Sequence, residues 1–521
     1  MTAPISRRQF AAHAAALGVG ALVLPRHLLG GVPGAPSRTL NLAMIGGGGM
    51  GASNASALVA AGHRIVALAD VDLAYADKTA RDRSRNGQTG AVNPDYARLA
   101  EQYGSAKRYT DFRRLIEREK GIDGVVVATP DHVHAVAAKM AMDAGKAVYV
   151  QKPLTYSVHE ARVLRETAAR TRVVTQMGNQ GHSSPEAQLI NTWVRSGKLG
   201  PVRTVHAWTN RPIWPQGVAR PAAAPPPEPA GWSGNAYTSR LLSQQLAGAM
   251  LAGAAGAVPP AGVDWDLYCG PAAAIPYHPV YHPFNWRGWV NFGVGALGDM
   301  GAHLVDHPYW ALGLTYPDRV EATSSPWGGD DADPASYPQA MLVHYDFPAR
   351  GAAPPVRMSW YDGGLMPERP AALPADVRLD RTGGVLIVGD RGVLLHETYG
   401  RNPRIFPEAL FREVAPDYVE ARERARRGAE AGRARPAAGP PAGAPAVSHE
   451  AQWANAVMGQ GAASCPLDYA GPLTETMLLG IVALRAGQGR TIAYDGARGE
   501  VTNAPEANAL LRREYRAGWS L

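Results

Sequence analysis

Two side chains with complementary acid–base chemistry lie four positions apart in the second half of the chain. Asp299 and His303 share one face if residues 298–312 form a helix. A carboxylate beside an imidazole fixes its tautomer and stabilises its protonated form, as a general base requires. His307 continues the spacing and leaves a metal site open, but Pro308 disturbs the helix there and no cysteine cluster supports zinc. We therefore expect an acid–base pair and no metal.

A glycine-rich turn near the N-terminus predicts a dinucleotide site. After a short apolar run, Gly46, Gly48 and Gly51 fill the three positions of a GxGxxG fingerprint that precedes a predicted helix. Such glycines make a tight turn, let the backbone approach a pyrophosphate and let the helix pack on the strand. The next strand, residues 64–69, ends at Asp70, whose carboxylate would accept the ribose hydroxyls and repel a 2′-phosphate. We expect NAD rather than NADP.

Strands and helices alternate through the first part of the chain. Residues 124–129 and 147–150 are predicted buried strands, and Ser157 with Glu160 forms a capping box that opens a further helix. This alternation predicts a parallel, doubly wound sheet with its ligand crevice at the carboxyl ends of the strands. Further residues expected to contact the cofactor there are Gly49, Met50, Thr129, Pro130, His132, Gln151 and Lys152.

Lys152 is also a candidate for chemistry, because it leaves a strand at that edge. Hydride transfer from a secondary alcohol needs a base for the hydroxyl proton and donors around the forming carbonyl. Burial beside a cationic cofactor would favour the neutral amine, so Lys152 is predicted to relay a proton or polarise a carbonyl.

Several of these motifs together resemble the glucose–fructose oxidoreductase/inositol dehydrogenase (Gfo/Idh/MocA) family. They are the glycine turn, Ala128-Thr-Pro-Asp-His132, Lys152-Pro153 and the Asp299-x-x-x-His303 spacing; Gln151 stands where the family usually has Glu. The resemblance covers residue 38 to the C-terminus apart from insertions. It implies an α/β fold, with an N-terminal Rossmann domain and a C-terminal α/β domain whose large, open, mainly antiparallel sheet often mediates oligomerisation. It also implies that His303 is the base, Asp299 its partner or a substrate ligand, and Lys152 the third member.

We divide the chain accordingly into a signal peptide at 1–37, a Rossmann domain at 38–156 and a substrate and oligomerisation domain at 157–521. Low-complexity insertions are predicted near 217–262 and 420–447. Alternating strands of the second domain are predicted at 202–208, 341–346 and 384–388.

Substrate contacts are predicted on two segments. Asn179, Gln180 and His182 follow an apolar strand and should face the crevice. Trp286 and Arg287 offer an aromatic platform and a fork of donors, a mixture that sugar rings favour.

The formal net charge of +7 does not predict nucleic-acid binding. Residues 1–37 and the arginine-rich stretch 421–435 account for the whole surplus, so we expect a targeting signal and a solvated linker. Arg7-Arg8 before a short apolar run resembles a twin-arginine signal, which predicts export to the periplasm without stable membrane insertion. Residues 285–298 and 469–521 also resemble an exported bacterial branch of the family.

Three functions remain open from the sequence. The leading one is an NAD(P)-dependent oxidoreductase acting on a sugar, cyclitol or glycoside, working as a homo-oligomer. The first alternative is a glycoside hydrolase with tightly bound, recycled NAD, because external cofactor is scarce after export. The second is a non-catalytic nucleotide- or sugar-binding protein, although the retained Lys152, Asp299 and His303 argue against it.

Overall fold

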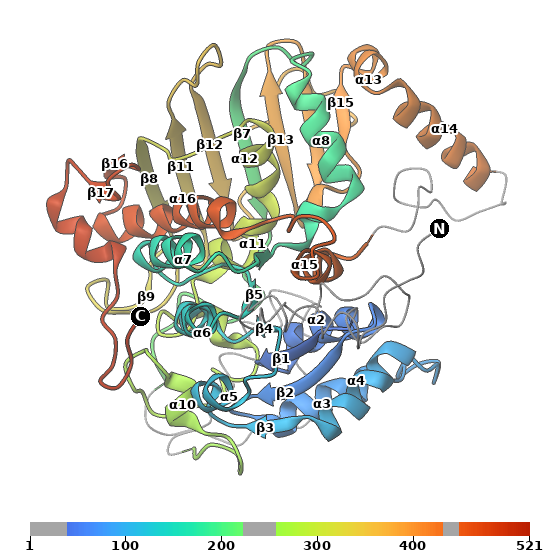
Figure 1. The fold of residues 1–521 in the computed structure, drawn as a ribbon. Coiled ribbons are helices and arrows are strands. Elements are labelled where there is room, and N and C mark those ends of the chain that lie inside the picture. Colours follow the sequence, from blue (N-terminus) through green and yellow to red (C-terminus); the bar gives the residue numbers. More distant parts are fainter. Residues whose placement is uncertain (1–38, 222–256, 431–446) are drawn as a thin grey trace, which may run out of the picture.

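The computed structural model describes residues 39–221, 257–430 and 447–521, which fold into two stacked parts (Figure 1). One part is built around a parallel sheet and the other around a larger mixed sheet. The predicted signal peptide lies outside the described residues, as do residues 222–256 and 431–446 of the two predicted insertions.

In the described part of the chain, six strands form the expected parallel sheet of a Rossmann fold, in the order β3-β2-β1-β4-β5-β6. Its strands are β1 (Asn41–Ile45), β2 (Arg64–Ala69), β3 (Lys107–Tyr109), β4 (Gly124–Val127), β5 (Ala147–Gln151) and β6 (Thr175–Gly178). The helices between them are α2 (Gly49–Ala60), α3 (Leu73–Arg83), α4 (Pro94–Ser105), α5 (Phe112–Arg118), α6 (Asp131–Asp143) and α7 (Val158–Thr171). Alternate residues of β1 join different apolar clusters, since helices cover both faces of the sheet.

The sequence predicted that the Rossmann domain ends at residue 156, but the domain continues beyond that residue. The capping box of Ser157 and Glu160 is present and opens α7. That helix is the crossover to β6, which pairs in parallel with β5. The apolar run before Gly178 therefore belongs to the first sheet and extends the domain to about that residue.

Nine described strands form the second sheet, in the order β15-β14-β13-β7-β12-β11-β8-β16-β17. They are β7 (Val202–Thr209), β8 (Arg319–Ser324), β11 (Met341–Phe347), β12 (Val356–Tyr361), β13 (Gly383–Gly389), β14 (Val393–Glu397), β15 (Arg404–Phe406), β16 (Thr491–Asp495) and β17 (Glu500–Val501). Strands β7 and β12 pair in parallel, and the other neighbours among these strands are antiparallel. The expected large, mainly antiparallel sheet and its three predicted strands are thereby confirmed.

The remaining elements surround this sheet and connect it to the first part. They are α8 (Pro185–Arg195), α10 (Trp265–Cys269), α11 (Gly295–Leu304), α12 (Asp306–Ala311), α13 (Glu408–Val414), α14 (Pro416–Glu430), α15 (His449–Val457) and α16 (Leu467–Ala486), with a strand pair β9 (Gly328–Gly329) and β10 (Pro334–Ser336). Short 3₁₀ helices are η3 (Gln180–Ser183), η4 (Asn285–Gly288), η5 (Thr398–Gly400) and η6 (Pro505–Leu511). Cys269 and Cys465 are both free and buried. In the described chain, no helix combines the length and apolar character that a membrane span needs.

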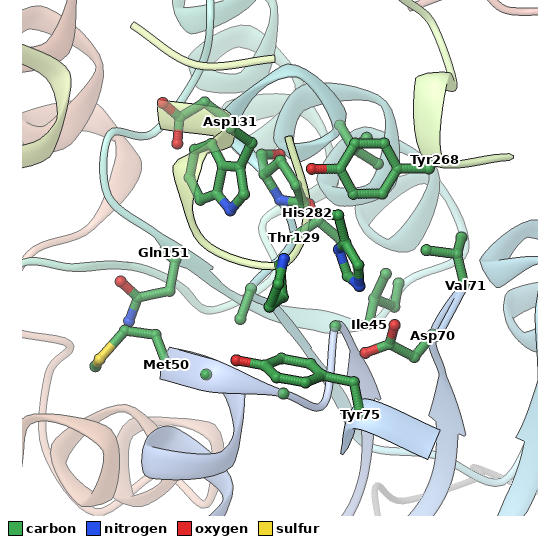
Figure 2. Close-up of a pocket in the computed structure, with 18 of the residues that line it drawn as sticks. Ile45, Met50, Asp70, Val71, Tyr75, Thr129, Asp131, Gln151, Tyr268 and His282 are labelled. Atoms are coloured by element: carbon green, nitrogen blue, oxygen red, sulfur yellow. The ribbon is translucent and has the colours of Figure 1, made fainter. Parts of the chain in front are cut away.

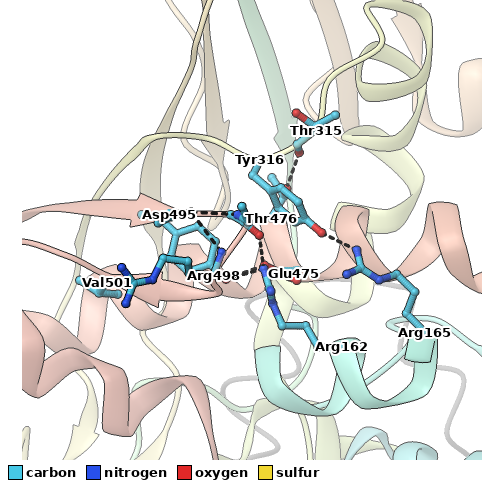
Figure 3. A network of polar contacts seen from close by, with 12 residues as sticks. Arg162, Arg165, Thr315, Tyr316, Glu475, Thr476, Asp495, Arg498 and Val501 are labelled. Atoms are coloured by element: carbon cyan, nitrogen blue, oxygen red, sulfur yellow. Dashed lines mark hydrogen bonds and ion pairs between the residues drawn. The ribbon is translucent and has the colours of Figure 1, made fainter. Parts of the chain in front are cut away.

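A buried polar network joins the two parts where α7 lies against α16 (Figure 3). Arg162 of α7 donates to Glu475 of α16 at 2.5 Å, and the hydroxyl of Tyr494 donates to the same carboxylate at 2.5 Å. Burial raises the pKa of Glu475, and Arg162 opposes that rise. Because Glu475 is only 1% exposed, removing Arg162 would leave a buried charge unpaired. The network therefore fixes the first sheet relative to the second.

Two segments differ locally from the sequence prediction. The linker expected from residue 420 begins as the helix α14, which pairs Arg424 with Glu420 at one-turn spacing; its alanines, arginines and glutamates favour a helix despite a weak apolar pattern. The helix expected over 298–312 breaks at Val305 into α11 and α12, so His307 lies on a different helix from Asp299.

Candidate active site

The glycine turn between β1 and α2 has the close packing that the fingerprint predicts. Gly46 has a φ of +87°, and a Cβ there would lie 2.6 Å from the carbonyl oxygen of Ala128. A Cβ on Gly51 would lie 2.0 Å from the Gly46 carbonyl oxygen, so α2 can approach the turn only with glycine. Gly48 precedes α2 without a side-chain cap, which leaves the first N–H groups of the helix for an anion. The turn fits the pyrophosphate of a dinucleotide.

Asp70 lies beside this turn, at the end of β2, as predicted. Its carboxylate accepts hydrogen bonds from the N–H of Gly47 at 2.7 Å and from the N–H of Asp72 at 2.9 Å. Burial raises the pKa of Asp70, and the two N–H groups lower it. The side chain lines a first cavity together with Tyr75 (Figure 2), where its carboxylate is placed to accept ribose hydroxyls.

The first cavity extends from the glycine turn to Lys152 and is covered by a segment of the second domain. Tyr268 and His282 line it from the side opposite Tyr75 (Figure 2). The Nε2 of His282 lies 2.8 Å from a carboxylate oxygen of Asp72, which ties this cover to the Rossmann domain. Burial raises the pKa of Asp72, but the hydrogen bond with His282 helps to hold it below its ordinary value. A ligand in this cavity is contacted by both domains.

Lys152 and Asp299 meet at the inner end of the cavity. The Nζ of Lys152 donates to the Asp299 carboxylate at 2.8 Å and to its backbone carbonyl at 2.9 Å. Arg287 and Arg211 approach the same carboxylate at 3.4 Å and 3.9 Å. Burial acts to raise the pKa of Asp299, but the three cations, Lys152 foremost, hold it well below its usual range. Lys152 is thus held in an ion pair with a largely buried carboxylate.

Asp299 and His303 lie on the same helix, α11, as predicted, but they are not joined in the predicted carboxylate–imidazole pair. The Asp299 carboxylate is taken up by Lys152, and within the described residues His303 Nδ1 has no hydrogen-bond partner. Burial, with a smaller effect of Lys152, lowers the pKa of His303 to about 3. The imidazole is thus neutral at neutral pH, and its ring meets the edge of Tyr399 at 4.7 Å. A neutral imidazole is the form that accepts a proton.

His303 lines a second cavity that adjoins the first. The two cavities share Met50, Lys152, Arg287 and Asp299. Residues of α11 and of the loop around η5 line the second cavity, together with Arg211 and Gln180. A small molecule in this cavity would lie against whatever occupies the inner end of the first.

Most of the residues predicted from the sequence line these cavities. Those in the first are Gly46, Gly48, Gly49, Met50, Asp70, Thr129, Pro130, Gln151, Lys152, Trp286, Arg287 and Asp299. Gln180 and His303 line the second. Their roles in binding and catalysis stay predictions.

Four predicted residues line neither cavity, namely Gly51 inside α2 and the three described next. His132 is buried beneath the cavity, and its Nε2 lies 2.8 Å from the carbonyl oxygen of Tyr268, so it supports the cover rather than a cofactor. Asn179 and His182 both bond the buried carboxylate of Asp306, with His182 stacked on Trp310. These side chains bond groups of the second domain and line neither cavity, so their predicted contacts with cofactor or substrate stay predictions.

Several cavity residues were missed by the sequence argument. Arg83 donates to the carbonyl of Gly49 at 2.8 Å, beside the glycine turn. Asp131 is buried in the first cavity, where burial raises its pKa to about 7. Tyr75, His282, Arg211, Tyr399 and Arg401 were missed as well, since no spacing in the sequence marks them. For Asp131 a signal existed, because it follows the predicted strand end Thr129-Pro130 directly.

The metal alternative gains no support from the placement of His307. Among the described residues, no group of three or more His, Cys, Asp and Glu side chains lies together in a way that could hold a metal ion. His307 packs edge-on against His396, with ring centroids 5.1 Å apart.

A parallel six-stranded sheet with a glycine turn, joined to a large open sheet that shares its crevice, defines the class of two-domain dinucleotide-binding oxidoreductases. A family model described as the oxidoreductase family, NAD-binding Rossmann fold, matches residues 40–179. A second model, the oxidoreductase family's C-terminal alpha/beta domain, matches residues 251–334. Two stretches of the chain thus match, in order, the NAD-binding domain and the C-terminal domain of the Gfo/Idh/MocA oxidoreductase family.

The chain matches named relatives over only part of their length. The chain is 29% identical over 130 residues to scyllo-inositol 2-dehydrogenase (NAD(+)) of Bacillus subtilis (strain 168), covering 25% of this chain and 35% of that protein. It is 28% identical over 171 residues to inositol 2-dehydrogenase 1 of Saccharopolyspora erythraea, covering 32% of this chain and 45% of that protein. The chain thus matches less than half the length of these relatives.

The structural similarity covers much more of the chain than the sequence matches do. A solved structure of levoglucosan dehydrogenase, in complex with NADH and levoglucosan, superposes with a TM-score of 0.50 at 15% identity. The superposition covers 87% of this chain and 99% of that one. This likeness shows that both domains share the fold.

Proposed function

We propose that this protein is an NAD-dependent dehydrogenase that moves a hydride between the nicotinamide and a hydroxyl-bearing carbon of a sugar, cyclitol or glycoside. The observation that carries the proposal is the wall shared by the two cavities, where Lys152 and Asp299 face both the NAD site and the second cavity. The names of the matched relatives, which are inositol dehydrogenases, support a polyol as the substrate class.

The residues at this wall can carry the proton chemistry of such a reaction. NAD, when bound, supplies the hydride acceptor. The neutral imidazole of His303 takes the proton from the substrate hydroxyl, and the Lys152 ammonium donates a hydrogen bond to the oxygen that becomes a carbonyl. Asp299 holds Lys152 in place through both its carboxylate and its backbone carbonyl. Burial limits the water around these groups, since the side chains of Lys152 and Asp299 are each 12% exposed and His303 is buried.

Replacing either acid–base residue tests this assignment. We expect His303→Ala and Lys152→Ala to lower kcat on any accepted sugar by about a hundredfold or more, the typical contribution of a positioned acid or base. Bound NAD should remain, because the glycine turn and Asp70 are untouched. NADH formation is followed by its near-ultraviolet absorbance, and nucleotide content by release on denaturation. Rates like those of the unmodified protein in both variants would contradict the assignment.

A glycoside hydrolase with recycled NAD is the second candidate, and the cover over the first cavity favours it. The bond between His282 and Asp72 encloses the nucleotide, which suits a cofactor that stays bound through many turnovers. Release of an aryl group from an aryl glycoside without net NADH would identify this activity. Net NADH from a free sugar would identify the dehydrogenase.

We further propose that the chain is exported by the twin-arginine route and that it forms homo-oligomers. Arg7-Arg8 followed by an apolar run supports the export signal, and the large open sheet of the second domain supports self-association. Export is tested by replacing both arginines with lysine and locating the protein in cell fractions, where retention in the cytoplasm is expected. Sedimentation of the purified protein tests the oligomer.

A further inference from the structure

The second cavity carries more positive than negative charge. Lys152, Arg211, Arg287 and Arg401 line it, and the acidic side chains in the same lining are Asp299 and Glu186. His303 adds no charge at neutral pH, because burial lowers its pKa to about 3. Four cations against two carboxylates leave a surplus of two positive charges.

Most of the side chains that carry this positive charge are largely buried. The side chains of Arg211 and Arg287 are 19% and 18% exposed, and that of Lys152 is 12% exposed. All three converge on the single carboxylate of Asp299. Asp131, which lines the first cavity, also acts on Lys152 and Arg287. The lining of the second cavity still holds two more cations than carboxylates, and charges in a partly desolvated site are costly unless an anion pairs with them.

Arg401 adds a further positive charge to the lining from the loop around η5. Its guanidinium lies over the ring of Tyr399 at 5.2 Å, and Tyr399 in turn contacts His303. The loop has a fixed form, since the N–H of Glu397 donates to the Arg401 carbonyl at 2.8 Å and Asn402 donates to the Glu397 carboxylate at 2.9 Å.

The backbone of this loop is also held in an unusual conformation. Tyr399 and Asn402 have φ values of +65° and +49°, and both line the cavity. Left-handed backbone at residues other than glycine costs about 1–3 kcal/mol and concentrates at ligand sites. The loop therefore presents Arg401 and Tyr399 to the cavity in a preset arrangement.

We propose that the second cavity takes a carbohydrate bearing an oxyanion, a carboxylate or a phosphate, which lies against Arg211 and Arg401 while the carbon to be oxidised lies near His303 and Lys152. The guanidinium fork matches both oxyanions, and it binds them more strongly than a neutral hydroxyl because the hydrogen bonds are charge-assisted. This inference rests on the proposed function and narrows its substrate from sugars in general to acidic sugars.

The test uses the full chain loaded with NAD⁺ and matched sugar pairs. The pairs are glucuronate and glucose, galacturonate and galactose, and glucose 6-phosphate and glucose. Two readouts are recorded for each compound, the ligand-induced rise in melting temperature and the formation of NADH. We expect the acid of at least one pair to bind tighter than its neutral parent, and added salt to weaken the acid selectively. A carboxylate preference over the phosphate, or the reverse, identifies the anion.

Arg401→Gln and Arg211→Gln locate the anion within the cavity. Each is expected to reduce the ratio of acid affinity to neutral affinity by about tenfold, the effect of one lost charge-assisted contact. Arg391→Gln is the matched control, because Arg391 is exposed and pairs with Glu413 away from both cavities. It should leave the ratio unchanged.

The outcomes separate this inference from the proposed function. Acid-selective binding that Arg401→Gln abolishes, without any NADH, would support the anion site and contradict the dehydrogenase. NADH formed from neutral sugars with no preference for acids would support the dehydrogenase and overturn the anion site. Failure of every acid to bind, or an equal loss of acid and neutral affinity in both arginine variants, would also overturn it.

Discussion

Gln151 lies in a directional hydrogen-bond chain that depends on its amide. Its Nε2 donates to Oδ1 of Asn54 at 2.9 Å, and Nδ2 of Asn54 donates to the carboxylate of Glu450 at 2.7 Å. All three residues are buried. A glutamate at position 151, the usual residue in the family, would accept a hydrogen bond instead of donating one. The Oδ1 of Asn54 would then face a carboxylate, because in this arrangement the NH₂ group of Asn54 donates to Glu450.

We therefore predict that Gln151→Glu lowers the free energy of unfolding by about 1–3 kcal/mol, the cost of an unpaired buried acceptor. The double variant Gln151→Glu with Glu450→Gln should recover most of this loss. In it, a flipped Asn54 side chain would donate to the new carboxylate at position 151 and accept from the new amide at position 450. Denaturant unfolding of the single and double variants measures the coupling. If the stability losses of the two single variants simply add in the double variant, the hydrogen-bond chain through Asn54 does not have this role.

At the residue scale, the sequence predicted which side chains gather but not how they pair. Asp299 and His303 were placed correctly on one helix by their spacing, and Lys152 by its strand end. The pairing of Asp299 with Lys152 joins residues that are 147 positions apart, so it depends on how the domains dock. Asn179 and His182 were misplaced for the same reason, since Asp306 draws both away from the crevice.

The cover over the NAD site is the element whose role is most directly testable. His282 bonds Asp72 and meets the edge of Tyr268, with ring centroids 5.3 Å apart. We predict that His282→Ala speeds NAD release by about tenfold, equivalent to the loss of roughly 1.4 kcal/mol of closure. His344→Ala, on β11 away from the cavities, is the matched control. Stopped-flow displacement of a fluorescent nucleotide provides the rate, and equal release from both variants would show that the cover is not closed by His282.

Elements with strong local signals were predicted well, and those without them were missed. The glycine turn, the buried strands and the capping box of α7 each have short-range patterns, and all appear in the structure. Helix α14 lacks an apolar stripe and was taken for a linker. The predicted boundary at residue 156 was wrong because the sequence pattern of α7 and β6 does not show to which sheet β6 belongs. In the structure β6 pairs with β5, so both elements are part of the first domain.

For the whole molecule, buried neutral histidines predict sensitivity to acid. Burial lowers the pKa of six of them from about 6.5 to about 3 or 4: His132, His134, His303, His307, His396 and His449. Between pH 4 and 6.5 the unfolded chain binds protons at these sites that the folded chain does not, so stability falls as pH falls through this window. Asp131, Asp70 and Glu475 act in the opposite direction, because burial raises their pKa values, that of Asp131 to about 7.

The six histidines outnumber these three carboxylates, so we expect the melting temperature to drop from pH 7 to pH 5. Each net proton contributes about 1.4 kcal/mol per pH unit once the unfolded site is charged. His396→Gln, which removes one such site away from the two cavities, should make the pH dependence shallower by one proton. Calorimetry across this range measures the slope. A melting temperature that is constant or rises toward pH 5 would contradict the account.

In the proposed reaction, a hydride passes between a sugar carbon and NAD at the wall formed by Lys152, Asp299 and His303. A single-turnover experiment tests it most directly, with NAD⁺-loaded protein mixed against each bound sugar and its carbon-deuterated form. We predict a rise in NADH absorbance that is slowed by deuterium at the oxidised carbon and lost in His303→Ala. If NAD is bound and the sugar binds, yet no NADH absorbance appears in any turnover, the claim is wrong.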